Sequence, residues 1–363
     1  MPTYRTLFAA GLGLLAALPA SASTLFMGSY PDQLLIFDES KAAVTGKLKL
    51  DTGLPTSMIL SDDGKHIYVT TITTSGIEVV DTATRRIVSK FSLNDGVTRY
   101  RFWGGAVDPT GRYFYTVITR FDREVDRYKV SKPMYAVIDL KLQKVARTAE
   151  MEKEDEKAAG GYRSALKVSP DGKYLYLFGD KILILNLADL KVIDRIDLAR
   201  PDGTDLENVG FGGAIDTART PGQYVSLFNA ADPYIHNKMF GVARFDLNSR
   251  QFAFTPIGPA PAAMAGLELT PDGKQAYTVV TNGTLGAKRC EFWHMDMTTN
   301  AVVDKAEFPC RSRFRFGMSM DGAKLYIYGA SYDVEVYDAR TLKLEATWDL
   351  GNDTTGAGMV AVE

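Results

Sequence analysis

The polar and apolar positions of this chain repeat as short apolar strands separated by glycine-containing turns. A turn of the form Asp-x-Gly or Asp-Gly recurs, usually followed by a basic residue and aromatic residues. Because an Asp-Gly pair supplies the positive φ of a tight turn, each copy predicts a hairpin between two strands. The copies lie at residues 61–69, 108–115, 169–176, 270–274 and 319–326, with a degraded copy at 220–224.

A second marker is an apolar strand that ends in Asp or Asn just before a turn. Successive markers are separated by 42 to 60 residues. The shortest spacings match the roughly 40–45 residues of a four-stranded propeller blade, and the longer ones indicate insertions in loops. We expect each marker side chain to cap its turn, which assigns these groups to structure rather than to acid–base catalysis. The markers are Asp38, Asp81, Asp139, Asn186, Asp246, Asp296 and Asp338.

The two markers together predict a ring of blades that is closed by both ends of the chain. There are seven of the second marker but only six of the first. Residues 23–30 look like the second strand of a blade, and residues 356–362 can supply its missing innermost strand. The fold class is therefore an all-β, seven-bladed β-propeller with four antiparallel strands per blade, closed by the C-terminal strand pairing into blade one. Such closure removes open sheet edges.

The first 22 residues read as a secretory signal peptide. Arg5 precedes an uncharged run at residues 7–18, and Ala20-Ser21-Ala22 is an A-x-A cleavage signal. The run is short for a bilayer span, so we expect no membrane span after cleavage. Residues 23–363 then form a single propeller domain, located most simply in a bacterial periplasm. The formal net charge of -2 argues against a nucleic-acid partner.

The only two cysteines, Cys290 and Cys310, fall near the ends of a predicted hairpin. Its strands are 289–297 and 301–309, which places the two cysteines roughly opposite each other. In an oxidising compartment we expect them to form a disulfide.

Long and varied loops are predicted on one face of the ring, which carries the links between blades and those between second and third strands. Because function tends to reside in loops on a rigid scaffold, this face is the better functional candidate. Aromatic residues and arginines there suit a docking surface, or they seal the gaps between blades and cap the channel. A charged insertion occupies residues 120–133. The partner or substrate-pocket candidates are Tyr100, Phe102, Trp103, Tyr234, His236 and Phe314.

No catalytic constellation is evident in the sequence, and neither a haem attachment motif nor a metal motif is present. His236 lies in a long loop and is the only histidine placed as a general base, although no partner for it is visible. His66 and His294 are interpreted as structural or remote. Asp202, Asp205 and Glu207 are close in sequence and leave a carboxylate metal site open. The interpretation is that this chain has no catalytic residue, metal or cofactor of its own.

The chain resembles YVTN-type propellers and, more narrowly, the β subunit of quinohemoprotein amine dehydrogenase. Residues 31–38 (PDQLLIFD) have that family's P-D-x-L-x-x-x-D form, and residues 102–111 (FWGGAVDPTG) are similar to its F-G-A-A-x-x-P-x-G segment. A charged insertion and then residues 135–139 (YAVID) follow in the family's order. Residues 337–342 (YDARTL) and 349–352 (DLGN) also match.

This resemblance implies a periplasmic complex of three subunits that oxidises primary amines. A dihaem cytochrome c subunit would carry electrons, and a small subunit would carry cysteine tryptophylquinone and the catalytic carboxylate. The propeller would be the platform that docks both and helps to wall the substrate pocket. Two alternatives stay open: a free-standing hydrolase or lactonase that uses His236 or the Asp202–Glu207 group, and a non-catalytic envelope binding protein.

Overall fold

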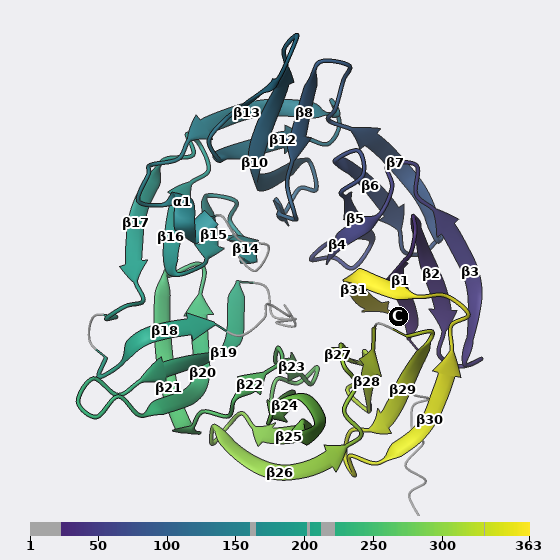
Figure 1. Cartoon of the computed structure of the whole chain (residues 1–363), viewed down its shortest axis with the longest axis vertical. Helices are drawn as coiled ribbons and strands as arrows, with labels where there is room; N and C mark the ends of the chain where they lie inside the picture. Colours follow the sequence, from purple (N-terminus) through teal and green to yellow (C-terminus); the bar gives the residue numbers. More distant parts are fainter. Residues whose placement is uncertain (1–22, 160–164, 202–203, 212–221, 330) are drawn as a thin grey trace, which may run out of the picture.

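The chain folds into a closed ring of β-sheets (Figure 1), and residues of the innermost strands line a channel at its centre. A computed structural model of the protein describes residues 23–159, 165–201, 204–211, 222–329 and 331–363. Within these residues the strands form seven antiparallel sheets, so the predicted seven-bladed propeller is confirmed. The predicted signal peptide lies outside the described residues. Among the described residues, no helix is long and apolar enough to cross a membrane.

Each blade has its first strand at the channel and its fourth at the rim of the ring. Blades one and two comprise β31 (Thr354–Val362), β1 (Thr24–Ser29), β2 (Gln33–Asp38) and β3 (Ala43–Lys49), then β4 (Pro55–Leu60), β5 (His66–Thr71), β6 (Gly76–Asp81) and β7 (Arg86–Ser92). Blade three comprises β9 (Ala106–Val107), β10 (Tyr113–Arg123), β12 (Met134–Asp139) and β13 (Lys144–Glu150), with β8 (Thr98–Arg101) and β11 (Tyr128–Val130) added to β10.

The remaining blades follow the same order. Blades four and five comprise β14 (Ala165–Val168), β15 (Tyr174–Phe178), β16 (Lys181–Asn186) and β17 (Val192–Asp197), then β18 (Glu207–Phe211), β19 (Gln223–Ala231), β20 (Lys238–Asp246) and β21 (Gln251–Pro259). Blade six comprises β22 (Ala263–Met264), β23 (Glu268–Leu269), β24 (Gln275–Asn282), β25 (Arg289–Asp296) and β26 (Ala301–Phe308). Blade seven comprises β27 (Arg315–Met318), β28 (Lys324–Tyr328), β29 (Asp333–Asp338) and β30 (Leu344–Asp349). The helical turns are α1 (Glu156–Ala159) and η1 (Leu285–Ala287).

The Asp-Gly turns form hairpins, as predicted, and each of them joins the first strand of a blade to the second. In the turn between β4 and β5, the Ser61 hydroxyl donates to Asp63 at 2.7 Å, and Asp63 accepts the amide of Lys65 at 3.1 Å. Gly64 has φ +71°, which only glycine adopts without strain. Equivalent turns precede β10, β15, β24 and β28. Residues 220 and 221 of the degraded copy lie outside the described residues.

The second marker also behaves as predicted, since all of its members accept hydrogen bonds from the turn that follows. At Asp38, hydrogen bonds from the side chains of Lys41 and Ser40 lower the carboxyl pKa to about 2. Hydrogen bonds from the turns likewise lower the carboxyl pKa of the other aspartates of this marker, so local turn chemistry holds them ionised at the face opposite the long loops.

Both ends of the chain close the ring, as expected. β31 pairs with β1 in the register Thr24↔Val362 to Met27↔Met359. Figure 1 shows β31, in yellow, between the channel and the purple β1. Side chains from neighbouring sheets then pack against each other, as at the last seam, where Phe37 of blade one stacks on Trp348 of blade seven with ring centroids 4.8 Å apart. Blade one is therefore completed only by contacts between the first and last residues of the domain.

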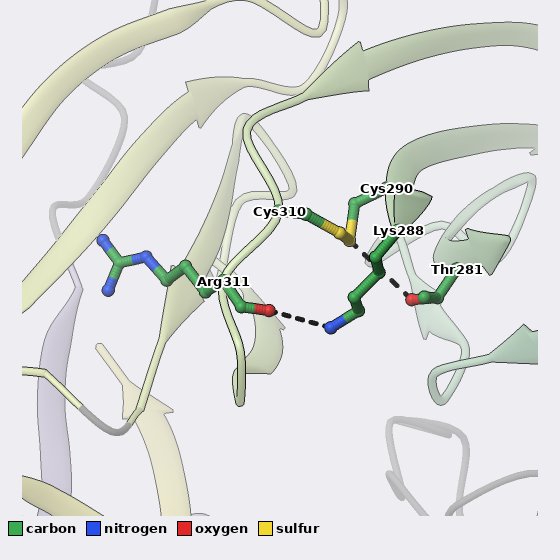
Figure 2. Close-up of a disulfide and its surroundings, with 5 residues drawn as sticks. All are labelled: Thr281, Lys288, Cys290, Cys310 and Arg311. Atoms are coloured by element: carbon green, nitrogen blue, oxygen red, sulfur yellow. Dashed lines mark hydrogen bonds between the residues drawn. A yellow bond between two sulfur atoms is a disulfide. The ribbon is translucent and has the colours of Figure 1, made fainter. Parts of the chain in front are cut away.

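The predicted disulfide is present between Cys290 and Cys310, with Cα atoms 5.2 Å apart (Figure 2). Cys290 lies on β25, and Cys310 follows the outermost strand β26 on the way to blade seven. The carbonyl of the next residue, Arg311, accepts the Lys288 ammonium at 2.8 Å. The disulfide thus fixes the point where the chain leaves blade six.

A Cys290→Ala, Cys310→Ala double variant is expected to lose about 3 kcal/mol of unfolding free energy, because the closed segment spans 20 residues. Urea unfolding of the oxidised proteins measures this loss. As a control, a reductant should lower the wild-type midpoint toward that of the variant and leave the variant unchanged. A wild-type midpoint that does not respond to reductant would contradict the prediction.

Candidate functional site

The innermost strands surround a central cavity of about 2970 Å³. Its lining comes from all the blades, since residues of β4, β9, β14, β18, β22, β27 and β31 contribute. Each of these strands is the first in its sheet and pairs mainly on its outer edge, so backbone groups as well as side chains face the channel. Lys167 on β14 is one of the lining residues; burial lowers the pKa of its amine to about 8, partly opposed by the carboxylate of Asp62. A fraction of this amine is therefore neutral at mildly alkaline pH.

The three neighbouring aromatic candidates have different positions. Phe102 is 2% exposed and meets Phe114 edge to face at 6.3 Å, so it takes the sealing role that the sequence left open. Tyr100 is half-buried against the same core cluster. Trp103 is 40% exposed, lines the channel, and has the guanidinium of Arg101 at 4.8 Å from its ring. Of the three, Trp103 is the one that offers a broad surface to another molecule.

Phe314 lies where the chain enters blade seven. It lines the channel and packs beside the disulfide-bearing cluster, with its ring 6.2 Å from that of Phe308. The Lys288 ammonium is 5.2 Å from the ring centroid. Arg311, in the same loop, is held within the chain by Asp333 and Glu335, at 2.8 and 2.9 Å. Ion pairs and aromatic packing within the chain therefore hold this loop in place.

His236 has a partner that the sequence did not reveal. Its Nδ1 is 2.5 Å from Oε1 of Glu207, which is 11% exposed, whereas the His236 side chain is 69% exposed. The pairing of β18 with β19 sets Glu207 opposite Ala231 and so brings the two residues together. Tyr234, in the same turn, is 81% exposed. A carboxylate that orients an imidazole can support proton transfer, but among the described residues that line the channel neither member of this pair appears.

The carboxylate metal site left open by the sequence gains no support. Asp202 lies outside the described residues, and Glu207 contacts His236. Elsewhere, ligand atoms of Glu152, Glu154 and Asp155 lie within 4.8 Å of one another. The guanidinium of Arg195 already contacts all of them, at 2.9, 3.3 and 2.8 Å respectively. An arginine thus occupies the place of a cation in this cluster.

Blade three carries a feature that sequence reasoning recognised only as a charged insertion. β10 continues past its pairing with β12, and residues 119–123 pair with β8 on one side and β11 on the other. We call this three-stranded unit the blade-three extension. The guanidinium carbon of Arg99 lies 5.9 Å from the ring centroid of Tyr128. Tyr128 is 47% exposed. The alternation of basic, aromatic and β-branched residues in this insertion was a signal for extra strands. Their pairing could not be predicted from it, because the partner strand β8 precedes the first strand of the blade in sequence.

The extension adds apolar surface beside its positive charge. Val97, Val125 and Val130 are 61%, 107% and 55% exposed. Arg123 and Lys129 are also exposed. Together with Trp103 and Arg101 at its base, the extension combines apolar and cationic side chains, which is the composition of protein-binding surfaces.

Solved structures of low sequence identity share this fold. Hydrazine synthase of Kuenenia stuttgartiensis is 16% identical with a TM-score of 0.50, over 86% of this chain and 89% of that chain. Dihydro-heme d1 dehydrogenase NirN, in complex with DHE, is 13% identical with a TM-score of 0.55, over 95% and 78%. A functionally unknown protein of Desulfotomaculum acetoxidans is 12% identical with a TM-score of 0.55, over 94% and 99%.

At these identities the similarity shows the propeller fold. Comparison with protein-family models and with curated proteins found no match. The resemblance to an amine dehydrogenase β subunit therefore stays a hypothesis, and what is shown is a β-propeller, one of whose structural neighbours is a heme d1 dehydrogenase by name.

Proposed function

We propose that this chain is the propeller subunit of a periplasmic complex of the quinohemoprotein amine dehydrogenase type. It would dock a small subunit bearing cysteine tryptophylquinone and a dihaem cytochrome c subunit, which together oxidise primary amines. The chain itself would contribute a platform and part of the pocket wall. The observation that carries this proposal is the blade-three extension, a projecting cationic and aromatic surface on the long-loop face.

The chemistry of the extension favours a protein partner with an acidic surface. Tyr128 and Trp103 offer rigid aromatic area, and arginines lie within cation–π distance of both rings. Aromatic and arginine side chains dominate the binding energy of protein interfaces, whereas surrounding charge mainly accelerates and orients association. One of the structural neighbours, dihydro-heme d1 dehydrogenase NirN, is a redox enzyme by name, which agrees with a role in electron-transfer chemistry.

The direct test is a pull-down of the tagged mature protein from its native periplasm, with haem staining and mass spectrometry. We expect a c-type cytochrome and a small quinone-bearing chain to co-purify, and the complex to reduce a dye when a primary amine is added. A clean monomer without partners would overturn the proposal.

A Trp103→Ala, Tyr128→Ala double variant is expected to weaken partner capture by at least about tenfold, because truncating an interface aromatic costs more than about 1 kcal/mol. Leu142→Ala is the matched control, since Leu142 is 57% exposed on the opposite face of the same blade. Equal loss in the control, or no loss in the double variant, would exclude the extension as the docking surface.

The Glu207–His236 pair gives the hydrolase alternative one concrete site. If the chain were a free-standing lactonase or esterase, its activity in a lactone and ester screen would fall at least about 100-fold in His236→Ala. Activity that persists in this variant would remove the pair from the mechanism. A protein that shows no activity in this screen and captures no partner subunits would instead support the role of a non-catalytic envelope binding protein.

A further inference from the structure

The buried carboxylate of Glu39, at the seam between the first and last blades, accepts a hydrogen bond from the backbone nitrogen of Ser23. The side chain of Glu39 is 4% exposed. Its Oε2 accepts a hydrogen bond from the Ser23 nitrogen at 2.9 Å. Its Oε1 accepts from the Lys324 ammonium at 2.9 Å and from the Tyr326 hydroxyl at 2.7 Å. One carboxylate therefore links the start of blade one to β28 of blade seven.

Ser23 is held at further points. Its carbonyl accepts the amide of Glu39 at 3.2 Å, and its hydroxyl accepts the amide of Met320 at 3.1 Å. The residue is 1% exposed. Contacts with blade one and blade seven thus fix the position of the Ser23 nitrogen.

We propose that the Glu39 carboxylate is the binding site for the α-ammonium that forms on Ser23 when the signal segment predicted from the sequence is removed at the Ala22–Ser23 bond. A secretory peptidase would add water across this bond. The carbonyl carbon of Ala22 gains the hydroxyl, and the Ser23 nitrogen gains a hydrogen. The proton of the new carboxylic acid then passes to the amine, which leaves a carboxylate on the released peptide and an ammonium on the mature chain. The Ala20-Ser21-Ala22 motif is placed for this cut.

The energetic reason is that a buried carboxylate needs strong donors on both oxygens. Before cleavage, Oε2 has only a neutral amide donor, whereas Oε1 has a full cation. The bond from the Ser23 amide is already charge-assisted, because its acceptor is ionised. Cleavage adds a full positive charge to the donor, and that charge attracts the carboxylate at the same short distance. The other charged groups nearby are Lys324, which is 35% exposed and screened by solvent, and Arg85, which donates to Thr24 at 3.0 Å. Asp38, adjacent to Glu39, is paired with Lys41.

The consequence is that processing strengthens ring closure. The new charge lies at the junction where the last blade meets the first, next to the β31–β1 pairing. The cut that releases the mature protein would thereby stabilise the seam that joins its two ends.

The test compares two proteins released from a removable N-terminal fusion, one beginning at Ser23 and the other retaining Ala22. The retained residue moves the α-ammonium about 3.8 Å along the chain. We expect the protein that begins at Ser23 to melt about 3 °C higher. Mass spectrometry of the secreted protein should also show Ser23 as the first residue. Equal melting temperatures, or cleavage at another bond, would overturn the proposal.

Two variants test the assignment to Glu39. In Glu39→Gln the melting difference between the two proteins should vanish, because the carboxylate is gone. In Lys324→Gln, which disturbs only the Oε1 side of the same carboxylate, the difference should persist. Loss of the difference in both variants, or its persistence in Glu39→Gln, would overturn the site. If Glu39→Gln does not fold, acetylation of Ser23 in the wild-type chain should remove the difference instead.

Discussion

A chain that ends at Asn352 is expected to give no folded monomer, because it lacks β31. That strand is the innermost strand of blade one and pairs with β1 along most of its length. All residues of β1 are buried, so deletion exposes a buried, unpaired strand edge. Met359 and Ala361 also pack in the core cluster shared by blades one and seven. An unpaired apolar edge of this kind promotes aggregation.

The measurement is the yield of soluble protein, followed by size-exclusion chromatography and circular dichroism. Removal of Glu363 alone is the control, since Glu363 is exposed and follows the end of β31. A milder variant is Gly28→Val, because a Cβ at Gly28 would clash with the Cβ of Ala357 on β31. This overpacking is expected to cost about 2 kcal/mol. A truncated chain that elutes as a folded monomer would show that the ring does not need its C-terminal strand.

Replacement of Asp155 by Asn is expected to cost about 3 kcal/mol of unfolding free energy, because it breaks a buried ion-pair network. Asp155 is fully buried and contacts the ammonium of Lys181 at 3.1 Å and the guanidinium of Arg195 at 2.8 Å. In the variant Lys181, which is 21% exposed, would lose this carboxylate. Chemical denaturation at neutral pH measures the loss. Glu154→Gln is the matched control, since Glu154 contacts the same arginine but is 62% exposed, and should cost less than about 1 kcal/mol.

The contribution of Asp155 also depends on pH. Burial raises the pKa of this carboxyl, but hydrogen bonds from Arg195 and Lys181 outweigh burial and hold the pKa below the ordinary value of 3.8. A group whose folded-state pKa is lowered stabilises the fold above its unfolded pKa and loses that contribution as the pH falls through the folded value. The difference between wild type and Asp155→Asn should therefore be full above about pH 5 and shrink in stronger acid. A difference that grows on acidification would contradict this account.

Candidate residues illustrate the limit of reasoning from the chain alone. Phe102 and Trp103 are adjacent and look equivalent in sequence, yet one is a core residue and the other is 40% exposed at the channel. Both residues follow the end of β8 at Arg101, so the direction of each side chain depends on how blade three meets its neighbours. The sequence left sealing and docking open for both, and only packing separated them.

What the sequence determined by itself was the repeat, the closure of the ring and the disulfide. These rest on short-range chemistry, since an Asp side chain caps amides two or three residues away, and on a count of turns that left one strand to be supplied by the C-terminus. The tertiary structure alone decided the contacts of His236 with Glu207 and of Asp155 with Arg195, which are 29 and 40 residues apart. It also decided the pairing of β8 with β10. The physical reason is that such contacts follow from strand register and blade packing, to which no local spacing in the chain corresponds.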